Sequence, residues 1–290
     1  MAESGLIIVD KPAEWTSHDV VAKMRRIAGT RRVGHAGTLD PMATGVLVVG
    51  VEKATRLLGH LTLTEKVYEA TIRLGVSTNT DDAEGEVVAT ASAADVTAPE
   101  IHKGVAALTG AIMQVPPQVS AIKVNGQRAY KKARAGEEVA LAARPVTVRQ
   151  FDVLDIRAGG DVVDVDAVIT CSSGTYIRSL ARDLGAALGV GGHLTRLRRT
   201  RVGPYDVSLA RSIEQLSEEC VILPIGEAVA AAFPRRDVTA EEARIIGHGG
   251  RLTAAGLGAG PIGVFGPEGE LLALVEEQGR VAKPLAVFAG

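Results

Sequence analysis

The pattern that most restricts the fold is a set of short segments in which apolar and polar residues alternate. In residues 67–74, Tyr68 and three further apolar side chains share one face, while the polar side chains share the other. This is the period of a β-strand with one buried face. Residues 162–170 alternate valine with aspartate in the same way. The chain therefore contains at least two strands that each bury one side.

Helix-like segments separate these strands. Ser17 begins a segment with apolar residues at helical spacing, Thr97 and Glu100 form a capping box, and a third helical segment follows Thr175. Because strands and helices do not alternate regularly, we expect an α+β fold with a mixed, largely antiparallel sheet flanked by helices. The remaining predictions are strands at 6–9, 46–51, 119–124 and 146–156, a helix at 54–63 and a loop at 31–45.

The composition changes near residue 235. A short helix is predicted at 240–246, and the glycine-rich segment beyond it contains a predicted hairpin of residues 262–265 and 271–275. We therefore expect two domains, a large one at 1–235 and a small, mostly β domain at 236–290.

The composition also excludes several classes of protein. With 46% hydrophobic residues, the 290-residue chain is too apolar to be disordered and long enough to bury a core. Two cysteines, Cys171 and Cys220, are too few for a disulfide framework or a four-ligand zinc site. The N-terminus lacks a signal-peptide pattern, and no apolar run approaches the ~18 residues of a membrane span. We expect a soluble cytoplasmic protein.

Basic residues are concentrated in three stretches that contain no acidic residue. Residues 23–32 carry five lysines and arginines, residues 123–134 carry five, and residues 193–201 carry four. The formal net charge of −2 therefore divides into +14 on these stretches and −16 elsewhere. Each stretch alone is typical of a solvated helix or loop face. The three together favour binding to the phosphate backbone of RNA or DNA.

The most informative segment is residues 34–47, Gly-His-Ala-Gly-Thr-Leu-Asp-Pro-Met-Ala-Thr-Gly-Val-Leu. It places His35 and Asp40 on a glycine-rich loop that enters a buried strand, and such loops often carry functional residues. Asp40 precedes Pro41, which disfavours helix and lets the carboxylate project from an extended turn. The pattern alone is equally compatible with Asp40 capping the turn and His35 making a local hydrogen bond.

This segment closely resembles the catalytic motif of the TruB family of tRNA pseudouridine synthases. Further segments agree with the family in order, from Asp10 to about Arg201, and these are residues 10–12 with 16–18, 66–70, 80–85, 116–126, 128–134 and 171–178. Val119 departs from the family pattern, which favours an aromatic residue there. The C-terminal part shows a weaker resemblance to a PUA-like RNA-binding domain.

The resemblance implies isomerisation of uridine 55 in the T loop of tRNA to pseudouridine. The bond between N1 and C1′ breaks, the uracil turns, and C5 bonds to C1′. No cofactor is implied, and the sequence has no P-loop, no strand-embedded Gly-x-Gly-x-x-Gly and no metal-spaced His and Cys set. The implied partner is the tRNA T stem-loop, clamped by an insertion at about 120–150. No membrane, metal or obligatory protein partner is implied.

The resemblance also assigns roles to single residues. Asp40 matches the essential aspartate, whose ionised form either attacks C1′ or takes a ribose proton. Arg178 matches the arginine that pairs with this aspartate, and Tyr68 matches the tyrosine that packs on the target base. His35 matches the residue that fills the space left by the flipped uridine. Further substrate contacts are implied for Arg56, Lys123, Tyr130, Tyr176 and Leu197.

Simpler interpretations stay open. Tyr68 fits a core tyrosine, Arg56 fits a solvated helix face, and Leu197 fits a core position or a helix face. Two other classes of function are a tRNA-binding or tRNA-folding protein whose catalysis is lost or secondary, and a small-molecule hydrolase that uses Asp40 with His35. The complete catalytic set argues against the first class, and the basic stretches argue against the second.

Overall fold

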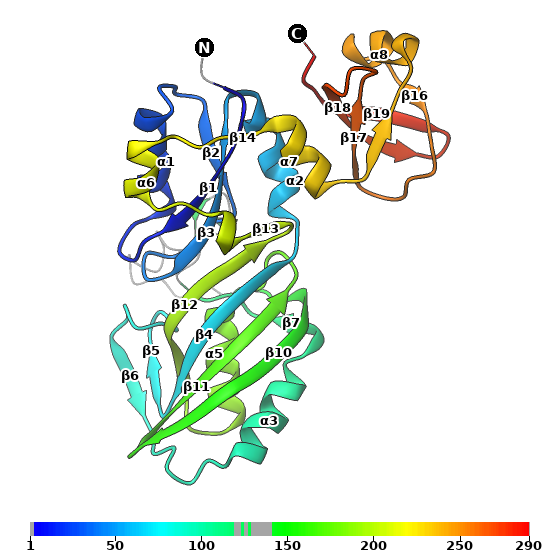
Figure 1. Ribbon diagram of the computed structural model, residues 1–290. Helices are drawn as coiled ribbons and strands as arrows, with labels where there is room; N and C mark the ends of the chain where they lie inside the picture. Colours follow the sequence, from blue (N-terminus) through cyan, green and yellow to red (C-terminus); the bar gives the residue numbers. More distant parts are fainter. Residues whose placement is uncertain (1–2, 119–122, 125–126, 129–140, 290) are drawn as a thin grey trace. The chain divides into compact units, whose positions relative to one another are not determined.

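The computed structural model describes residues 3–118, 123–124, 127–128 and 141–289. It divides into two compact units. Figure 1 shows the chain coloured along the sequence, from blue at the N-terminus to red at the C-terminus. The first unit comprises Met1–Pro41, Gly45–Thr64 and Val202–Gly290, and the second comprises Met42–Thr44 and Glu65–Arg201. Helices and a mixed set of strands occur in both, so the α+β prediction is confirmed.

The second unit is built on a sheet with the strand order β12-β4-β11-β10-β7, and helices α3 and α5 pack on it (Figure 1). Adjacent pairs from β4 to β7 are antiparallel. The elements of this unit are β4 (Lys66–Leu74), β5 (Val76–Thr78), β6 (Val87–Thr90), α3 (Ala98–Ala107), β7 (Gly110–Gln114), β8 (Lys123–Val124), β9 (Gln127–Arg128), β10 (Arg144–Gly159), β11 (Val162–Cys171), α5 (Ile177–Ala187) and β12 (Gly192–Val202).

The predicted alternation of apolar and polar side chains in residues 67–74, which form most of β4, is confirmed. Tyr68, Ala70 and Ile72 are buried on one face, and Glu69 and Arg73 are only partly buried on the other. The predicted strand at 162–170 is β11, in which Val163 and Val165 are buried and the two aspartates lie at intermediate exposure. Of the predicted strand at 119–124, residues 119–122 lie outside the described residues.

The third basic stretch corrects one expectation. Residues 193–201 lie in strand β12 and form neither a helix nor a loop. The buried face of this strand carries His193, Leu197 and Arg199. Because two of these three residues are polar, the hydropathy of the segment does not alternate, and the pattern of a strand is hidden in the sequence.

The first unit begins with strands in the order β14-β1-β3, with β2 also paired to β3. One apolar cluster packs helix α1 on β1 and β3, with Val20 and Met24 against Ile7 and Val49. The elements are β1 (Gly5–Lys11), α1 (Ser17–Ile27), β2 (Val33–Ala36), β3 (Thr44–Val51), the 3₁₀ helix η1 (Glu52–Leu57), α2 (Leu58–Thr62), β13 (Tyr205–Asp206), the 3₁₀ helix η2 (Val207–Leu209), α6 (Ile213–Glu218), β14 (Leu223–Pro224) and α7 (Ile225–Ala232).

Two predictions in this unit are wrong in detail. The expected loop at 31–45 contains strand β2, whose four residues pair with the end of β3. The expected helix at 54–63 is the 3₁₀ helix η1 followed by the short helix α2. Neither element is long enough to show a clear period in the sequence.

The chain ends in a five-stranded sheet with the order β15-β17-β18-β19-β16 and one helix, α8. The predicted hairpin is confirmed, because β17 and β18 pair in antiparallel register. Phe265 and Phe288 share an apolar cluster with Leu57 and Tyr205 of the same unit. The elements are β15 (Arg235–Asp237), α8 (Ala240–Gly247), β16 (Leu252–Thr253), β17 (Pro261–Phe265), β18 (Leu271–Gln278) and β19 (Val281–Val287).

Candidate active site

Asp40 lies in the first unit, on the segment between β2 and β3. We call residues 37–43 the Asp40 loop. Gly37, the first residue of this loop, and Gly45, two residues after its end, have φ angles of 79° and 97°, a conformation that glycine adopts without strain. Asp40 itself is half-buried. The glycines of the sequence motif thus allow the chain to turn on both sides of the carboxylate.

A buried lysine holds this loop. The side chain of Lys11 is fully buried at the end of β1, and its Nζ donates to the carbonyl oxygens of Pro12 at 2.9 Å, Trp15 at 2.5 Å and Pro41 at 3.1 Å. The carbonyl of Pro41 also accepts from the amide of Glu14 at 2.9 Å. Since Pro41 follows Asp40 directly, these contacts fix the backbone on the C-terminal side of the carboxylate.

A buried serine holds the N-terminal side of the Asp40 loop. The Oγ of Ser17 accepts from the amide of Leu39 at 2.9 Å and donates to the carbonyl of Leu39 at 3.2 Å. Ser17 is fully buried in the first turn of α1. Lys11 and Ser17 therefore fix the residues immediately after and before Asp40, which restricts the directions in which its carboxylate can point.

His35 and Arg56 lie in the same unit as Asp40. His35 is on β2, half-buried, and its ring meets that of His18 edge to face, with 5.8 Å between centroids. Arg56 is exposed on η1, and its Nη1 donates to the carbonyl of Val287 at 2.6 Å. Lys53 makes a similar contact with the carbonyl of Phe288 at 2.9 Å. In this structure, Arg56 thus bonds the last strand of the chain.

The expected residues Tyr68, Tyr176, Arg178 and Leu197 lie in the second unit. Arg178 is almost fully buried near the start of α5, where its Nη1 donates to the carbonyl of Thr80 at 2.9 Å and lies 3.3 Å from Oδ2 of Asp82. A cation in the first turn of a helix is not favoured by the helix dipole, so Arg178 needs a partner outside the helix. Asp82 supplies that partner within the unit.

The turn that presents Asp82 is itself well ordered by hydrogen bonds. Oδ1 of Asp82 accepts from the hydroxyl of Thr80 at 2.6 Å and from the amide of Glu84 at 3.1 Å. Its carbonyl accepts from the hydroxyl of Thr78 at 2.7 Å. These hydrogen bonds fix the carboxylate of Asp82, which in turn fixes the guanidinium of Arg178 that it faces.

Tyr176 directly precedes α5. Its amide donates to Oε1 of Gln114 at 2.8 Å, and its carbonyl accepts from Nε2 of Gln114 at 3.1 Å, so one amide side chain brackets the main chain. Leu197 is buried on β12. The side chain of Lys123 and all of Tyr130 lie outside the described residues, so their expected RNA contacts stay predictions.

Two buried cations lie on the strands around Tyr68, namely Lys66 on the same strand, β4, and Arg199 on the neighbouring strand, β12. Lys66 is 6% exposed and Arg199 is 1% exposed. Burial, and then the positive charge of Arg199, lower the pKa of Lys66 to about 8. Cys171, which pairs with Lys66 across β4 and β11, has its pKa raised to about 11 by burial. This end of the sheet therefore concentrates positive charge in a poorly hydrated place.

The chain matches known proteins along nearly its whole length. Residues 25–177 match the family profile described as TruB family pseudouridylate synthase (N terminal domain). Residues 178–229 match the tRNA pseudouridylate synthase B C-terminal domain, and residues 233–289 match tRNA Pseudouridine synthase II, C terminal. The chain belongs to the TruB family of pseudouridine synthases.

Its relatives include two bacterial proteins named tRNA pseudouridine synthase B. The protein of Thermobifida fusca is 64% identical over 290 residues, with 99% of each chain covered. That of Streptomyces griseus subsp. griseus is 60% identical, with 98% of this chain and 97% of the relative covered.

Solved structures of the same fold extend the comparison to two assemblies, one of which is bound to RNA. A chain in the structure described as H/ACA RNP bound to a substrate RNA containing 2'-deoxyuridine is 27% identical, with a TM-score of 0.73 over 99% of this chain and 85% of that one. A chain of a Cbf5-Nop10-Gar1 complex is 28% identical with the same TM-score, over 99% and 84%.

The structure thus brings the TruB motif residues together in two groups. Asp40 and His35 share the first unit with Arg56, and Tyr176 and Arg178 meet at the start of α5 in the second. The pairing of Arg178 with Asp40 stays a prediction. Sequence reasoning missed four supporting residues, namely Lys11, Ser17, Asp82 and Gln114. Three of them lie in segments that matched the family, which was the available signal.

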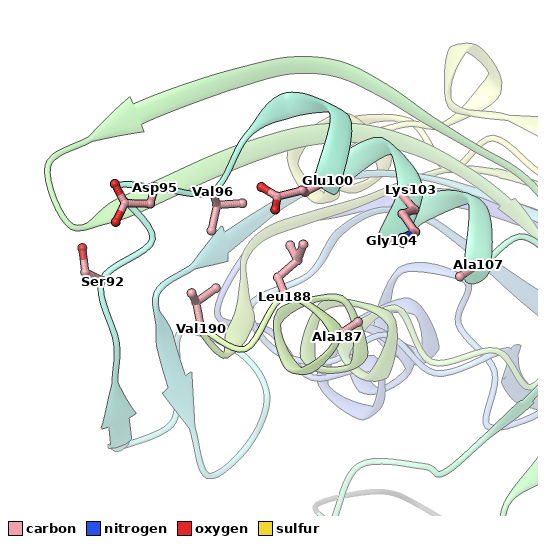
Figure 2. Close-up of a pocket in the computed structure, with 10 residues that line it drawn as sticks. All are labelled: Ser92, Asp95, Val96, Glu100, Lys103, Gly104, Ala107, Ala187, Leu188 and Val190. Carbon is pink, nitrogen blue, oxygen red and sulfur yellow. The ribbon is translucent and has the colours of Figure 1, made fainter.

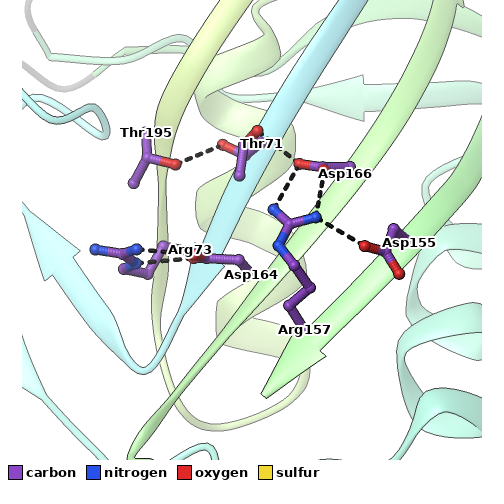
Figure 3. A network of polar contacts seen from close by, with 7 residues as sticks. All are labelled: Thr71, Arg73, Asp155, Arg157, Asp164, Asp166 and Thr195. Carbon is purple, nitrogen blue, oxygen red and sulfur yellow. Dashed lines mark hydrogen bonds and ion pairs between the residues drawn. The ribbon is translucent and has the colours of Figure 1, made fainter. Parts of the chain in front are cut away.

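The polar face of the second unit's sheet is a separate feature (Figure 3). Arg157 bridges Asp155 and Asp166, and Arg73 forms two hydrogen bonds with Asp164 at 2.7 and 2.8 Å. These side chains lie on the face opposite Tyr68, since they alternate with the buried residues of β4 and β11. Their charges compensate one another, so this face offers little to a phosphate backbone.

Most arginines of the third basic stretch, residues 193–201, already pair with acids of this protein or are buried. Arg196 pairs with Glu69 at 3.2 Å and Arg201 pairs with Glu65 at 2.9 Å, while Arg199 is buried. The first basic stretch, residues 23–32, instead presents arginines at a surface cavity. Arg25, Arg26 and Arg31 line a cavity of about 430 Å³ at the end of α1.

A cavity of about 500 Å³ opens between α3 and the end of α5 (Figure 2). Its floor is apolar, with Leu188 and Val190, and its rim carries Asp95, Glu100 and Lys103. None of the predicted site residues that the structure describes lines this cavity. Among the residues that the structure describes, no cluster of His, Cys, Asp and Glu could hold a metal ion, and no helix is long and apolar enough to cross a membrane.

Proposed function

We propose that this chain isomerises uridine 55 in the T loop of tRNA to pseudouridine, with Asp40 as the essential carboxylate. The observation that carries the proposal is the near-full-length identity of 64% to a tRNA pseudouridine synthase B, combined with an aspartate held on both sides by Lys11 and Ser17. A fixed carboxylate suits a reaction that needs attack or proton removal at one ribose carbon.

The reaction is balanced without a cofactor. The N1–C1′ bond breaks, the uracil rotates, a C5–C1′ bond forms, the proton leaves C5, and N1 takes up a proton. Ionised Asp40 either forms a bond to C1′ that is later broken or takes a ribose proton that is later returned. Arg178, already fixed by Asp82, is suited to hold Asp40 ionised once RNA is bound.

The remaining residues are assigned to RNA binding. The uridine leaves the stack at a cost of a few kcal/mol, Tyr68 packs on it, and Tyr176 and Leu197 shape the pocket. His35 fills the vacated space. Arg56 contacts either phosphate or, as in the free protein, the carbonyl of Val287.

The partner is the T stem-loop alone, with no obligatory protein, and the reaction takes place in the cytoplasm. The segment at about 120–150 clamps the RNA, and residues 236–290 form a PUA-like RNA-binding domain that follows the catalytic domain at 1–235. The five-stranded sheet with α8 supports this last assignment.

The test is incubation of the purified chain with an unmodified T-arm transcript, followed by chemical labelling that maps pseudouridine to single nucleotides. Product at the T-loop uridine, and nowhere else in the arm, is the expected result. If no product forms there, the proposed function is wrong.

A further inference from the structure

Helix α5 carries two arginines on one face, four residues apart. Arg178 and Arg182 are at positions i and i+4, which are neighbours on a helix surface. The Nη1 of Arg178 lies 3.3 Å from Oδ2 of Asp82, and the Nη1 of Arg182 lies 3.1 Å from Oδ2 of Asp81. Because the two acids are consecutive, both arginines hold the same turn.

The turn at Asp81 needs such support. Asp81 has a φ angle of 62°, in the left-handed region that residues other than glycine rarely adopt. Its carboxylate side chain is only 14% exposed. Burial raises the pKa of Asp81, and the positive charge of Arg182 opposes this shift. Arg182 therefore favours the ionised carboxylate in a strained, partly dehydrated turn.

Arg182 also holds a second segment. Its Nη2 donates to the carbonyl of Val115 at 2.8 Å, and the hydroxyl of Ser179 donates to the same carbonyl at 2.9 Å. Gln114, the preceding residue, brackets the main chain of Tyr176. Arg182 thus contacts both segments that hold the two site residues at the start of α5, namely the turn beside Arg178 and the chain beside Tyr176.

We propose that Arg182 is a positioning residue for the pseudouridine synthase site. It ties the Asp81 turn and Val115 to α5, and thereby holds the guanidinium of Arg178 and the backbone of Tyr176 in place. The inference rests on the proposed function. In the structure the guanidinium of Arg182 contacts the carboxylates of Asp81 and Asp183 and the carbonyl of Val115, so its loss is expected to slow the reaction without weakening RNA binding.

The variants that test this are Arg182→Gln and Arg182→Lys. Arg182→Gln removes the positive charge, whereas Arg182→Lys keeps the charge but loses the planar guanidinium that can bond two acceptors at once. Arg157→Gln is the matched control, since Arg157 also bridges two acids in this unit but lies on the opposite face of the sheet (Figure 3). For each, we would measure the single-turnover rate constant on a T-arm transcript, the Kd for that transcript, and the Tm.

Arg182→Gln is expected to lower the rate constant about tenfold with Kd unchanged within about twofold. The rate constant of Arg182→Lys should lie between those of Arg182→Gln and the wild type. Arg157→Gln should react at the wild-type rate even where its Tm changes as much as that of Arg182→Gln. In the double variant with Asp81→Asn, the rate should be no lower than in the slower single variant, because the two residues act through one contact.

The inference is overturned if Arg182→Gln reacts at the wild-type rate, if its loss is entirely in Kd, or if Arg157→Gln loses as much. If Arg182→Gln does not fold, the same criteria apply to Arg182→Lys. An inactive wild-type protein would instead refute the proposed function, so the two failures are distinguishable.

Discussion

The ammonium of Lys11 and the carbonyl of Pro41 lie 3.1 Å apart, although 30 residues separate them in the chain. This contact joins the end of the first strand to the residue that follows Asp40. A lysine that is fully buried must satisfy its charge, and Lys11 does so on backbone carbonyls around the loop. The position of the proposed catalytic carboxylate therefore depends on a residue outside its own motif.

Lys11→Met should damage both stability and catalysis. We expect the free energy of unfolding to fall by roughly 2 kcal/mol, because three carbonyl groups lose a charged donor. The single-turnover rate should fall on the order of tenfold or more, since the Asp40 loop loses an anchor. Lys53→Met is the control, because Lys53 donates to the carbonyl of Phe288, away from the loop. A wild-type rate in Lys11→Met would contradict this role.

The stability of the protein should depend on pH through Lys66. The pKa of Lys66 is lowered from 10.5 to about 8 in the folded state. Between these values the unfolded chain binds more protons, so the contribution of Lys66 to stability rises with pH across that window. Below pH 8 the buried charge is present in full and its cost is constant.

Urea unfolding of the wild type and of Lys66→Met from pH 7 to 9 checks this prediction. The difference in unfolding free energy between wild type and variant should shift in favour of the wild type by about 1 kcal/mol from pH 8 to 9. The range ends at pH 9 because burial raises the pKa of Cys171 to about 11 in the folded state. Above pH 9 the thiol ionises more readily in the unfolded chain, which lowers the unfolding free energy as pH rises and opposes the effect of Lys66. A difference that stays constant with pH would show that Lys66 is not neutralised in the fold.

The cavity at the end of α1 should contact RNA phosphates. Replacing Arg25, Arg26 and Arg31 together by glutamine should reduce the slope of log binding constant against log salt by roughly 2 to 3, at about 0.9 per duplex phosphate. A triple glutamine variant of Arg73, Arg157 and Arg235 removes the same charge from guanidinium groups that already pair with acids. Equal slopes in the two variants would remove the cavity from the RNA interface.

Periodic elements were predictable from the sequence, and elements whose buried faces carry polar residues were not. Strand β4 was predicted because Tyr68 and its apolar neighbours repeat every second residue. Strand β12 was missed because buried Arg199 and His193 make its inner face as polar as its outer face. Hydropathy cannot distinguish a buried arginine from a solvated one, since only tertiary contacts neutralise or shield it.

The same limit applies to the site. Asp40 was identified because residues 34–47 resemble the catalytic motif of the TruB family, whereas the local pattern alone was equally compatible with a turn cap. Lys11 and Asp82 were not assigned roles, although their segments matched the TruB family. Their contacts, with Pro41 and Arg178, span 30 and 96 residues of sequence and depend on the packing of whole elements. Such pairs have no periodic or local signature.

The most direct test of the account is the reaction of Asp40→Asn with an unmodified T-arm transcript, with product and binding measured on the same preparation. Asparagine keeps the size of the side chain and removes the negative charge. We predict that no pseudouridine forms at the T-loop uridine, while the Kd for the transcript stays within about threefold of the wild-type value. Pseudouridine formation by Asp40→Asn at the wild-type rate would contradict the central claim.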